Sequence, residues 1–373
     1  MLQRLYVHNF RCLENFELIL KEMSSSLLIG KNGAGKSTIA SALEVLQSAG
    51  RGINRMRDLE EKGLIGPKDF NRGRSDVPIR FEIEVLLDKK LYKYILALEL
   101  PENFRELRVV EEQLLIAGNP IYSRKEAQVT LYTTSPKNSE AQFLVDWHLI
   151  ALPIIQAQSA TDPLRIFKSW LASMIILAPI PSWMTGESSG ETLEPKRDGS
   201  NFGEWFSGLL SRYPAAYTQT DRYLREVMPD IQDFLNEQIG KDSKSMVVRF
   251  EAKSANLSVD FKDLSDGEKC FFLCAVVLAA NKYYGPLFCF WDEPDNYLSL
   301  SEVGHFVTSL RRSFKDNGQI IVTSHNEEAI RKFSNENTFV LDRKSHLEPT
   351  LVRLLSDLPI SGDLVDTLIR GDI

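Results

Sequence analysis

Short runs in which apolar and polar residues alternate dominate the first half of the chain. The first is Leu2 to Leu20, interrupted by Asn9-Phe10-Arg11. A period of two places successive side chains on opposite faces of a strand. The pattern returns, separated by turn residues, in Ile79 to Leu87, Lys93 to Glu99 and Val109 to Ile116. It predicts an antiparallel meander of strands.

Helical spacing replaces this alternation in the middle of the chain. Thr133 to Ser139 and Trp183 to Ser200 are polar and predict loops, the second of them mobile. Asn201 to Ile239 then predicts helices, before Val247 to Phe261 returns to a strand pattern. The apolar faces of these helices would be formed by Phe202, Trp205, Phe206, Leu209 and Leu210, and by Tyr223, Leu224, Val227, Ile231, Phe234 and Leu235.

The last third alternates between helix and strand. Helical patterns in Ser265 to Lys282 and Leu300 to Lys315 are each followed by an apolar strand pattern, in Leu287 to Trp291 and Gln319 to Thr323. This order predicts parallel strands covered by helices, so the fold class is α/β. The expected domains are an N-terminal lobe (1–180), a helical subdomain (181–246) and a C-terminal lobe (247–373).

Composition narrows the class of protein. The 373 residues are 43% hydrophobic and 25% charged, as in ordinary globular proteins. A net charge of −7 argues against broad nonspecific DNA affinity. Arginines do gather after the first expected helix, where a loop could face a polyanion, although solvated surface charge is the favoured interpretation. These arginines are Arg51, Arg55, Arg57, Arg72 and Arg74.

Apolar runs and cysteines predict a cytoplasmic protein with no membrane partner. The longest apolar run, Cys270 to Ala280, is too short to span a bilayer, and the N-terminus lacks the apolar core of a signal peptide. The cysteines form no C-x-x-C pair, so we interpret them as reduced core thiols rather than zinc ligands. They are Cys12, Cys270, Cys274 and Cys289.

The strongest chemical signal is a glycine-rich loop. Gly30 to Thr38 matches G-x-x-x-x-G-K-[ST] between the apolar stretch Leu27-Leu28-Ile29 and a helix pattern. Such a loop wraps its backbone N–H groups around phosphates, with Lys36 on the β- and γ-phosphates and Ser37 on Mg²⁺. A purely structural glycine turn is the disfavoured alternative. The candidate nucleotide-binding residues are Asn32, Gly33, Ala34, Gly35, Lys36, Ser37 and Thr38.

Two strands of the last third end in groups suited to hydrolysis. Leu287 to Trp291 ends in Asp292, a candidate Mg²⁺ ligand, and Glu293, a candidate base for the attacking water. Gln319 to Thr323 is followed by Ser324 and His325, which could touch the γ-phosphate. The alternatives are a strand that ends in solvated acids and a structural histidine.

A helix start completes the set of candidate residues. Leu264 to Lys269 precedes the apolar helix pattern, and its Ser265 and Gly267 lie where unpaired N–H groups suit a phosphate. A plain helix cap formed by Ser265 or Asp266 is the other interpretation, and both can hold together.

In this order, the motifs resemble those of ABC-type ATPases of the RecF/SMC branch. The sequence also resembles stand-alone predicted AAA ATPases related to the ATPase domain of overcoming-lysogenization-defect nucleases. The resemblance covers Leu2 to about Arg343. It is carried by the start from Leu5 to Arg11, the phosphate loop (Walker A), the signature Leu264 to Lys269, the Walker B strand through Pro294, the D-loop Asp295 to Leu298, and Ser324-His325. Asp198 to Asn201 also matches a stretch in these proteins.

The resemblance implies a P-loop ABC-type ATPase head with a mixed sheet, an antiparallel β-meander and a helical subdomain. It implies ATP and Mg²⁺ as cofactors, Arg11 as a further nucleotide contact, catalysis by Lys36, Glu293 and His325, and head-to-tail pairing of two copies. Ser265 and Gly267 would then act on the ATP of the opposite copy.

The function implied by this resemblance is a nucleotide-driven switch for a separate effector, a nuclease or toxin, in bacterial anti-phage defence or DNA repair. The alternative is a RecF-like DNA-binding repair ATPase without an effector nuclease. A transporter ATPase fits the motifs less well. About thirty residues follow Arg343, so we expect no Toprim nuclease domain here, and no sustained heptads predict a coiled-coil arm.

Two departures from the family pattern are visible. The signature reads Ser-Asp-Gly-Glu rather than Ser-Gly-Gly-Gln, which puts the Asp266 carboxylate near a phosphate. No glutamine follows Ile175-Ile176-Leu177 as a Q-loop residue, and Pro179 to Trp183 offers no obvious ligand there.

Overall fold

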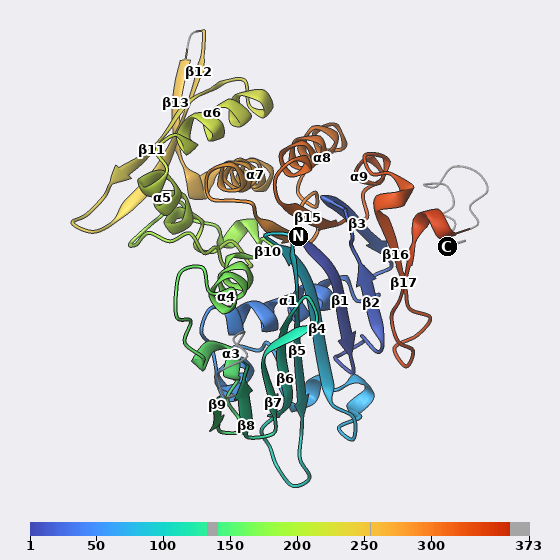
Figure 1. Ribbon diagram of the computed structural model, residues 1–373. Coiled ribbons are helices and arrows are strands. Elements are labelled where there is room, and N and C mark those ends of the chain that lie inside the picture. The colour runs from blue at the N-terminus through green and yellow to red at the C-terminus, as the bar shows by residue number, and fades with distance from the viewer. Residues whose placement is uncertain (133–140, 254, 359–373) are drawn as a thin grey trace. The chain divides into compact units, whose positions relative to one another are not determined.

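The computed structural model describes residues 1–132, 141–253 and 255–358, which form two compact units (Figure 1). Unit 1 comprises Met1–Met23, Gly30–Met174 and Phe339–Leu358. The described part of unit 2 comprises Ser24–Ile29 and, apart from residue 254, Ile175–Thr338. The expected loop at Thr133 to Ser139 lies outside the described residues.

Unit 1 is built on an eight-stranded antiparallel sheet with the order β2-β1-β4-β5-β6-β7-β8-β9. The predicted meander is confirmed, and it continues beyond Ile116 into strands that the weaker alternation there did not reveal. The strands are β1 (Leu2–His8), β2 (Phe16–Ile19), β4 (Ile79–Leu87), β5 (Lys90–Glu99), β6 (Arg108–Ile116), β7 (Asn119–Lys125), β8 (Gln128–Leu131) and β9 (Ala141–Leu144).

Helices and a hairpin complete unit 1. Its helices are α1 (Lys36–Gly50), α2 (Met56–Glu61), α3 (Ala151–Ile154) and α4 (Pro163–Ser173), and its hairpin joins β16 (Thr338–Asp342) to β17 (Leu351–Leu354). Helix α4 packs on the meander through Phe167, whose ring stacks on Tyr92 with centroids 6.0 Å apart. It packs on α1 where Gly50 leaves room for Leu171.

A fully buried carboxylate joins the meander to α3. Glu112 accepts hydrogen bonds from the hydroxyls of Tyr94 (3.0 Å) and Tyr122 (2.8 Å). It also accepts from the backbone N–H groups of Ala151 (2.7 Å) and Leu152 (2.8 Å), at the start of α3. Because four donors replace water, this charge can be buried without a large penalty.

A second carboxylate, Glu82 on β4, gives unit 1 a predicted dependence on pH. Burial raises the pKa of Glu82, but hydrogen bonds from Arg4, Arg80 and Lys93 outweigh it and lower the pKa from 4.5 to about 2. A depressed folded-state pKa means that the stabilisation is complete above the unfolded value and is lost as the pH falls toward 2.

We therefore expect the free energy of unfolding of Glu82→Gln to depend less on pH under acidic conditions than that of the wild type. The free energy of unfolding measured with urea should fall less between about pH 5 and pH 3 than in the wild type, by up to about 2 kcal/mol. Glu102→Gln is the control, because Glu102 is exposed in a loop. If the free energies of unfolding of Glu82→Gln and the wild type fell equally with pH, the depressed pKa of Glu82 would be contradicted.

Unit 2 contains the predicted parallel sheet, with the order β10-β14-β15-β3. The strands are β10 (Ile175–Leu177), β14 (Phe288–Trp291), β15 (Gln319–Thr323) and β3 (Ser25–Gly30), of which Ser25 to Ile29 belong to unit 2. Helices α7 (Asp266–Tyr283), α8 (Leu300–Lys315) and α9 (Glu327–Arg331) lie side by side over it (Figure 1). The parallel strands and covering helices of the last third are confirmed.

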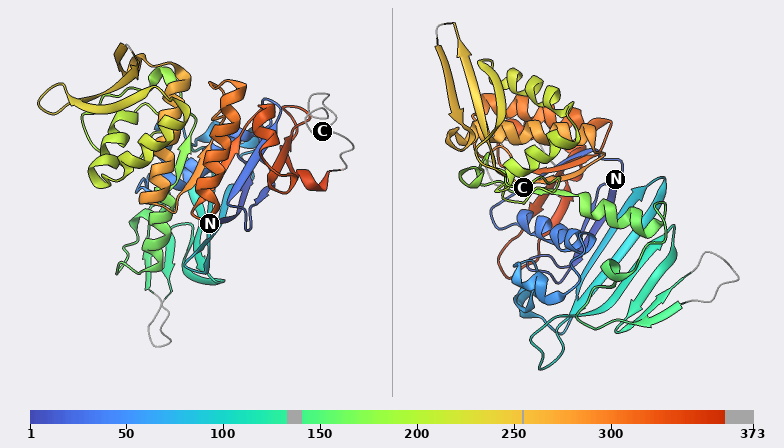
Figure 2. Two further views of the ribbon diagram at one scale, coloured as in Figure 1. Left: turned by 90° about the horizontal axis from the view of Figure 1, so that it is seen from above. Right: turned by 90° about the vertical axis from the view of Figure 1, so that its left-hand side faces the viewer.

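The remainder of unit 2 corrects one prediction. Helices α5 (Phe202–Arg212) and α6 (Ala216–Val227) are present, and α6 packs along α7 (Figure 2). The chain then forms a three-stranded antiparallel sheet of β11 (Ile231–Gln238), β12 (Lys244–Ala252) and β13 (Ala255–Asp260). The predicted helical face through Ile231, Phe234 and Leu235 was therefore wrong. The pairing of β11 with β12 shifts in register between Ile231 and Asp233. Because of this shift, Ile231 and Phe234 are both buried although they are three residues apart, a spacing that is also typical of a helix.

The buried positions predicted for the cysteines are confirmed. All four cysteines are buried free thiols, and burial raises the pKa of Cys270 to about 12, so this thiol stays protonated at neutral pH. Across the described residues, every helix is too short or too polar to cross a bilayer.

Candidate active site

The glycine-rich loop lies between β3 and α1, as predicted. It presents an open helix N-terminus, because α1 begins without a side-chain cap and without an acidic residue in its first turn. Lys36 is only 6% exposed, and its ammonium donates to the backbone oxygen of Gly30 at 2.7 Å. A bare helix N-terminus beside a held ammonium is a site for an anion.

Glycine is required at both ends of this loop. Gly30 has a φ of 152°, and a Cβ there would lie 2.2 Å from the backbone oxygen of Leu341 on β16. Gly35 has a φ of 102°, and a Cβ there would lie 2.9 Å from Cys12 Sγ and from Thr350 Oγ1. The loop is thus held between the β16–β17 hairpin and the segment after β1, with no room for larger residues.

The other candidate residues of the loop differ in their exposure. Asn32, Gly33 and Ser37 are exposed, whereas Ala34 is buried and its N–H donates to the backbone oxygen of Lys31 at 3.1 Å. Thr38 N–H donates to the backbone oxygen of Gly35 at 3.0 Å. Ser37 therefore offers its hydroxyl to solvent at the first turn of α1.

Arg11 lies beneath α1, where internal contacts occupy its guanidinium. Its Nε donates to Asp69 Oδ1 at 2.8 Å, and its Nη1 donates to Ser41 Oγ at 2.9 Å. Ser41 Oγ in turn donates to the backbone oxygen of Ser37 at 3.1 Å. These bonds buttress the first turn of α1, and a direct contact between Arg11 and nucleotide remains a prediction.

In unit 2, parallel pairing brings the candidate carboxylates to one sheet edge. Trp291 on β14 is in register with Val322 on β15, and Val322 with Leu27 on β3, so these strands end together. The chain leaves β3 at this edge to enter the glycine-rich loop. Asp292 is 9% exposed and accepts a hydrogen bond from Thr323 Oγ1 at 2.6 Å through Oδ1.

Both oxygens of Glu293 have neighbours that orient them. Its Oε2 accepts a hydrogen bond from Asn296 Nδ2 at 2.7 Å, and its Oε1 lies 3.3 Å from His325 Nε2. Its backbone has a φ of 48° and its N–H donates to Thr323 Oγ1 at 2.9 Å. The structure therefore brings Asp292, Glu293 and His325 together, with Thr323 joining the two acids.

The next acid, Asp295, is a buried neighbour of this cluster. It is 4% exposed, and its Oδ2 accepts a hydrogen bond from Ser324 Oγ at 2.6 Å. Burial raises the pKa of Asp295 by more than this bond lowers it. The bond fixes the segment that starts at Asp295 to the end of β15.

Ser265 and Gly267 lie at the start of α7, where the cap interpretation fits the contacts. Ser265 Oγ accepts from Glu268 N–H at 3.3 Å, and Glu268 Oε2 accepts from Ser265 N–H at 2.7 Å, which is a capping box. A Cβ on Gly267 would lie 3.1 Å from the backbone oxygen of Tyr297. The phosphate role of both residues remains a prediction.

Sequence reasoning missed three side chains that the structure places on the acids of this cluster. Thr323 and Asn296 contact Asp292 and Glu293 as described, and Arg197 Nη2 lies 3.9 Å from Asp292 Oδ2. The position of Thr323 at the end of a strand beside β14 was a usable signal, because parallel strands end at one edge. Arg197 is far from Asp292 in sequence and gave no such signal.

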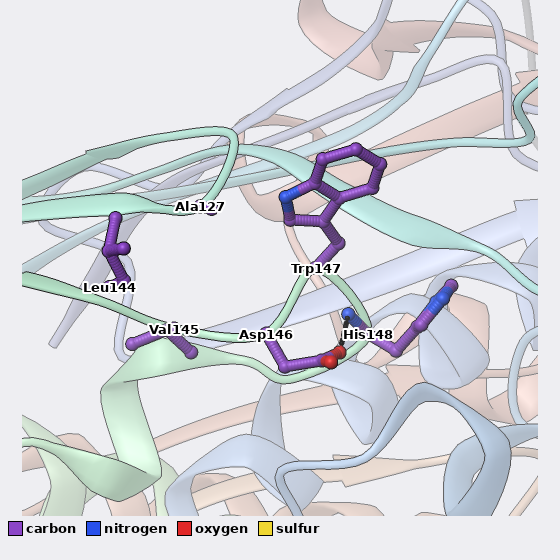
Figure 3. Close-up of a pocket in the computed structure, with 6 residues that line it drawn as sticks. All are labelled: Ala127, Leu144, Val145, Asp146, Trp147 and His148. Carbon is purple, nitrogen blue, oxygen red and sulfur yellow. Dashed lines mark hydrogen bonds between the residues drawn. The ribbon is translucent and has the colours of Figure 1, made fainter.

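A separate surface pocket of about 420 Å³ lies on the meander of unit 1 (Figure 3). It is lined by Ala127 and by Leu144 to His148, none of which belongs to a predicted motif. His148 N–H donates to Asp146 Oδ1 at 2.8 Å, and Arg108 lies over the ring of Trp147 at 4.7 Å. The glycine-rich loop and the candidate residues Asp292, Glu293 and His325 are therefore not among the residues that line this pocket.

Comparisons with known proteins identify the family. Residues 1–347 match the model of the RecF/RecN/SMC N terminal domain. No curated protein sequence matches the chain significantly. Among solved structures, an SMC head bound to the C-winged helix domain of ScpA is 13% identical, with a TM-score of 0.53, and the match covers 95% of this chain and 98% of that one. An SMC head domain from Thermotoga maritima is 13% identical, with the same coverage of both chains and a TM-score of 0.47. The chain belongs to the RecF/RecN/SMC N-terminal domain family and has the α/β fold of an ABC-type ATPase head.

Proposed function

We propose that this chain binds and hydrolyses ATP with Mg²⁺, and that it works as a nucleotide-driven switch for a separate effector protein. The observation that carries the proposal is the open start of α1, with Lys36 held at the phosphate loop. The family match supports ATPase activity in general. Direct measurement of Mg²⁺-dependent ATP hydrolysis by the purified chain is the basic test.

The donor chemistry fits Mg²⁺. Magnesium prefers hard oxygen ligands and is commonly held by one or two carboxylates together with nucleotide phosphates. Asp292 offers its carboxylate and Ser37 its exposed hydroxyl, and both are such oxygens. Bound Mg²⁺ would neutralise charge that develops on the transferred phosphoryl group.

Glu293 is the candidate general base. Asn296 donates to one oxygen of its carboxylate, and His325 lies beside the other, so both oxygens have neighbours that orient them. A fixed carboxylate can accept a proton from the attacking water. His325 would contact the γ-phosphate from the position next to Glu293.

Two copies of this chain would pair head to tail. In this proposal, the start of α7 in one copy docks on the ATP held by the phosphate loop of the other. Ser265 would break its bond to Glu268 and offer its hydroxyl and the helix N-terminus to the γ-phosphate. The carboxylates of Asp266, which is exposed, and Glu268, which is half-buried, oppose a phosphate, so we expect this pairing to weaken at low Mg²⁺.

Mixing two inactive variants tests the shared site. We expect Ser265→Arg to lose turnover while it still binds ATP, because its own phosphate loop is untouched, and Lys36→Ala to lose binding. In a mixed pair, one site carries both changes and the other carries neither. Hydrolysis should therefore return on mixing, to no more than about half the wild-type rate if each intact site fires independently.

Two controls make the mixing result interpretable. Subunit exchange is measured with fluorescently labelled copies, and failure to recover activity despite exchange would contradict independent shared sites. Ser299→Arg breaks an equivalent capping box at the start of α8, formed with Glu302. Its melting temperature shows what loss of such a cap costs, about 1 kcal/mol, apart from any effect on docking.

An effector protein is favoured over DNA as the direct partner, because several of the arginines that follow α1 already contact acidic side chains or backbone oxygens. Glu14 pairs with both Arg72 and Arg74, at 2.6 Å for Arg74, and Glu61 pairs with Arg57 at 2.9 Å. Arg51 Nε donates to the backbone oxygen of Ala172 at 3.1 Å. These cations are partly neutralised, which weakens the counterion release that drives DNA binding.

An anti-phage or DNA-repair setting and a nuclease or toxin effector are our proposal from the sequence resemblance. The similar SMC head binds a partner domain, which supports a protein partner in general. Salt-dependent binding of duplex ends by the purified chain alone would favour the RecF-like alternative. A nuclease encoded beside this protein, copurifying with it in the presence of ATP, would favour the effector.

A further inference from the structure

The oxygen of Asp292 that faces away from Thr323 has a cationic neighbour. Arg197 Nη2 lies 3.9 Å from Asp292 Oδ2, whereas Oδ1 accepts the hydrogen bond from Thr323. Arg197 keeps 28% of its side chain exposed, and Asp292 keeps 9%. A nearly buried carboxylate without a positive partner would be costly, so this pair offsets part of the cost of its burial.

The backbone around Arg197 is tied to the end of β10, next to β14. Ala178 N–H donates to the backbone oxygen of Arg197 at 2.8 Å, and Ile180 N–H donates to that of Asp198 at 2.9 Å. Asp292 N–H donates to the backbone oxygen of Leu177 at 2.7 Å. The guanidinium therefore extends from a backbone that is fixed on the same strand end as Asp292.

A compact turn holds the other side of this segment. Asp198 Oδ1 accepts from Ser200 N–H at 2.9 Å, and Gly199 has a φ of 75°. Asn201 Oδ1 accepts from Lys196 N–H at 2.7 Å, directly before α5. The place of Arg197 therefore depends on backbone bonds that a change of its side chain leaves intact.

We propose that Arg197 is a positioning residue that competes with the divalent cation for the Asp292 carboxylate. The inference rests on the proposed function, because it takes Asp292 as the metal ligand. A guanidinium and a metal ion repel one another and cannot both approach Oδ2 closely. Arg197 thus keeps Asp292 neutralised before the metal arrives, and it raises the concentration of metal needed to load the site.

The test is a titration of the full chain with Mn²⁺ in the presence of a nonhydrolysable ATP analogue. Electron paramagnetic resonance measures the free Mn²⁺ at each step, and the bound Mn²⁺ follows by difference. We expect Arg197→Gln to bind Mn²⁺ about fivefold more tightly than the wild type, the size expected for losing a partly exposed ion pair. Arg197→Lys should stay close to the wild type. Arg197→Met gives the same test if the Gln variant does not fold.

Lys196→Gln is the matched control, because Lys196 is exposed, adjacent and of the same charge. It should change the Mn²⁺ affinity less than twofold, which separates the local pair from a general charge effect. Unchanged or weaker Mn²⁺ binding in both Arg197→Gln and Arg197→Met, in chains that melt like the wild type, overturns the inference alone. A wild-type chain that binds no Mn²⁺ with nucleotide, or an Asp292→Asn variant that binds it equally, overturns the proposed metal site instead.

Discussion

Glu293→Gln should slow ATP hydrolysis by a factor of roughly 10² to 10⁴, the range for removing a general base, while ATP still binds. An amide has nearly the shape of the carboxylate but cannot accept a proton from water. Its oxygen can still accept the hydrogen bond from Asn296, and its NH₂ can donate to the neighbouring His325. The variant should therefore fold and load nucleotide normally.

Because hydrolysis would release the paired heads, Glu293→Gln should also accumulate a larger ATP-bound species. Steady-state phosphate release measures the first effect, and light scattering with and without ATP measures the second. Glu327→Gln is the control, since Glu327 on α9 forms a surface ion pair with Arg331 in the same helix. Hydrolysis by Glu293→Gln at the wild-type rate would exclude Glu293 as the base.

The parallel sheet shows how far the sequence pattern reaches. Hydrophobic patterns correctly predicted β14, β15 and the helices α7 and α8, because such patterns depend on burial that is local in sequence. The order β10-β14-β15-β3 depends on pairing between distant segments, which no window of sequence contains. The proposed lobe boundaries remain predictions for the same reason.

The β11 segment shows a different limit. Ile231 and Phe234 are buried three residues apart because a register shift in the strand inserts an extra residue. A helix with the same residues buried would show an identical pattern. Pro229 and Asp230, directly before the strand, were a local signal against continuing α6, since proline disfavours a helical conformation in the residue before it.

In the candidate site, too, some residues could be predicted from local sequence and others could not. Motif spacing predicted Lys36, Asp292, Glu293 and His325 as site residues, and the last three lie together in the structure, although their roles remain predictions. The hydrogen-bond partners that orient them were not predictable, because Thr323 and Asn296 act through side-chain geometry rather than through a spacing rule. Arg197 was even harder to predict from the sequence, since the backbone bonds at the end of β10 set its position.

Lys36→Ala should weaken ATP binding by roughly 100-fold, the size expected for losing a charge-assisted bond to phosphate in a mostly buried site. The ammonium is only 6% exposed and already lies within the loop, where it donates to the backbone oxygen of Gly30 at 2.7 Å. Little side-chain ordering would be needed when phosphate arrives, so most of the interaction energy contributes to affinity. Lys31→Ala is the matched control, because Lys31 is an exposed lysine of the same loop. Calorimetric titration with ATP and Mg²⁺ measures both variants, and a Lys36→Ala variant that melts like the wild type and retains full affinity would contradict the phosphate-loop assignment.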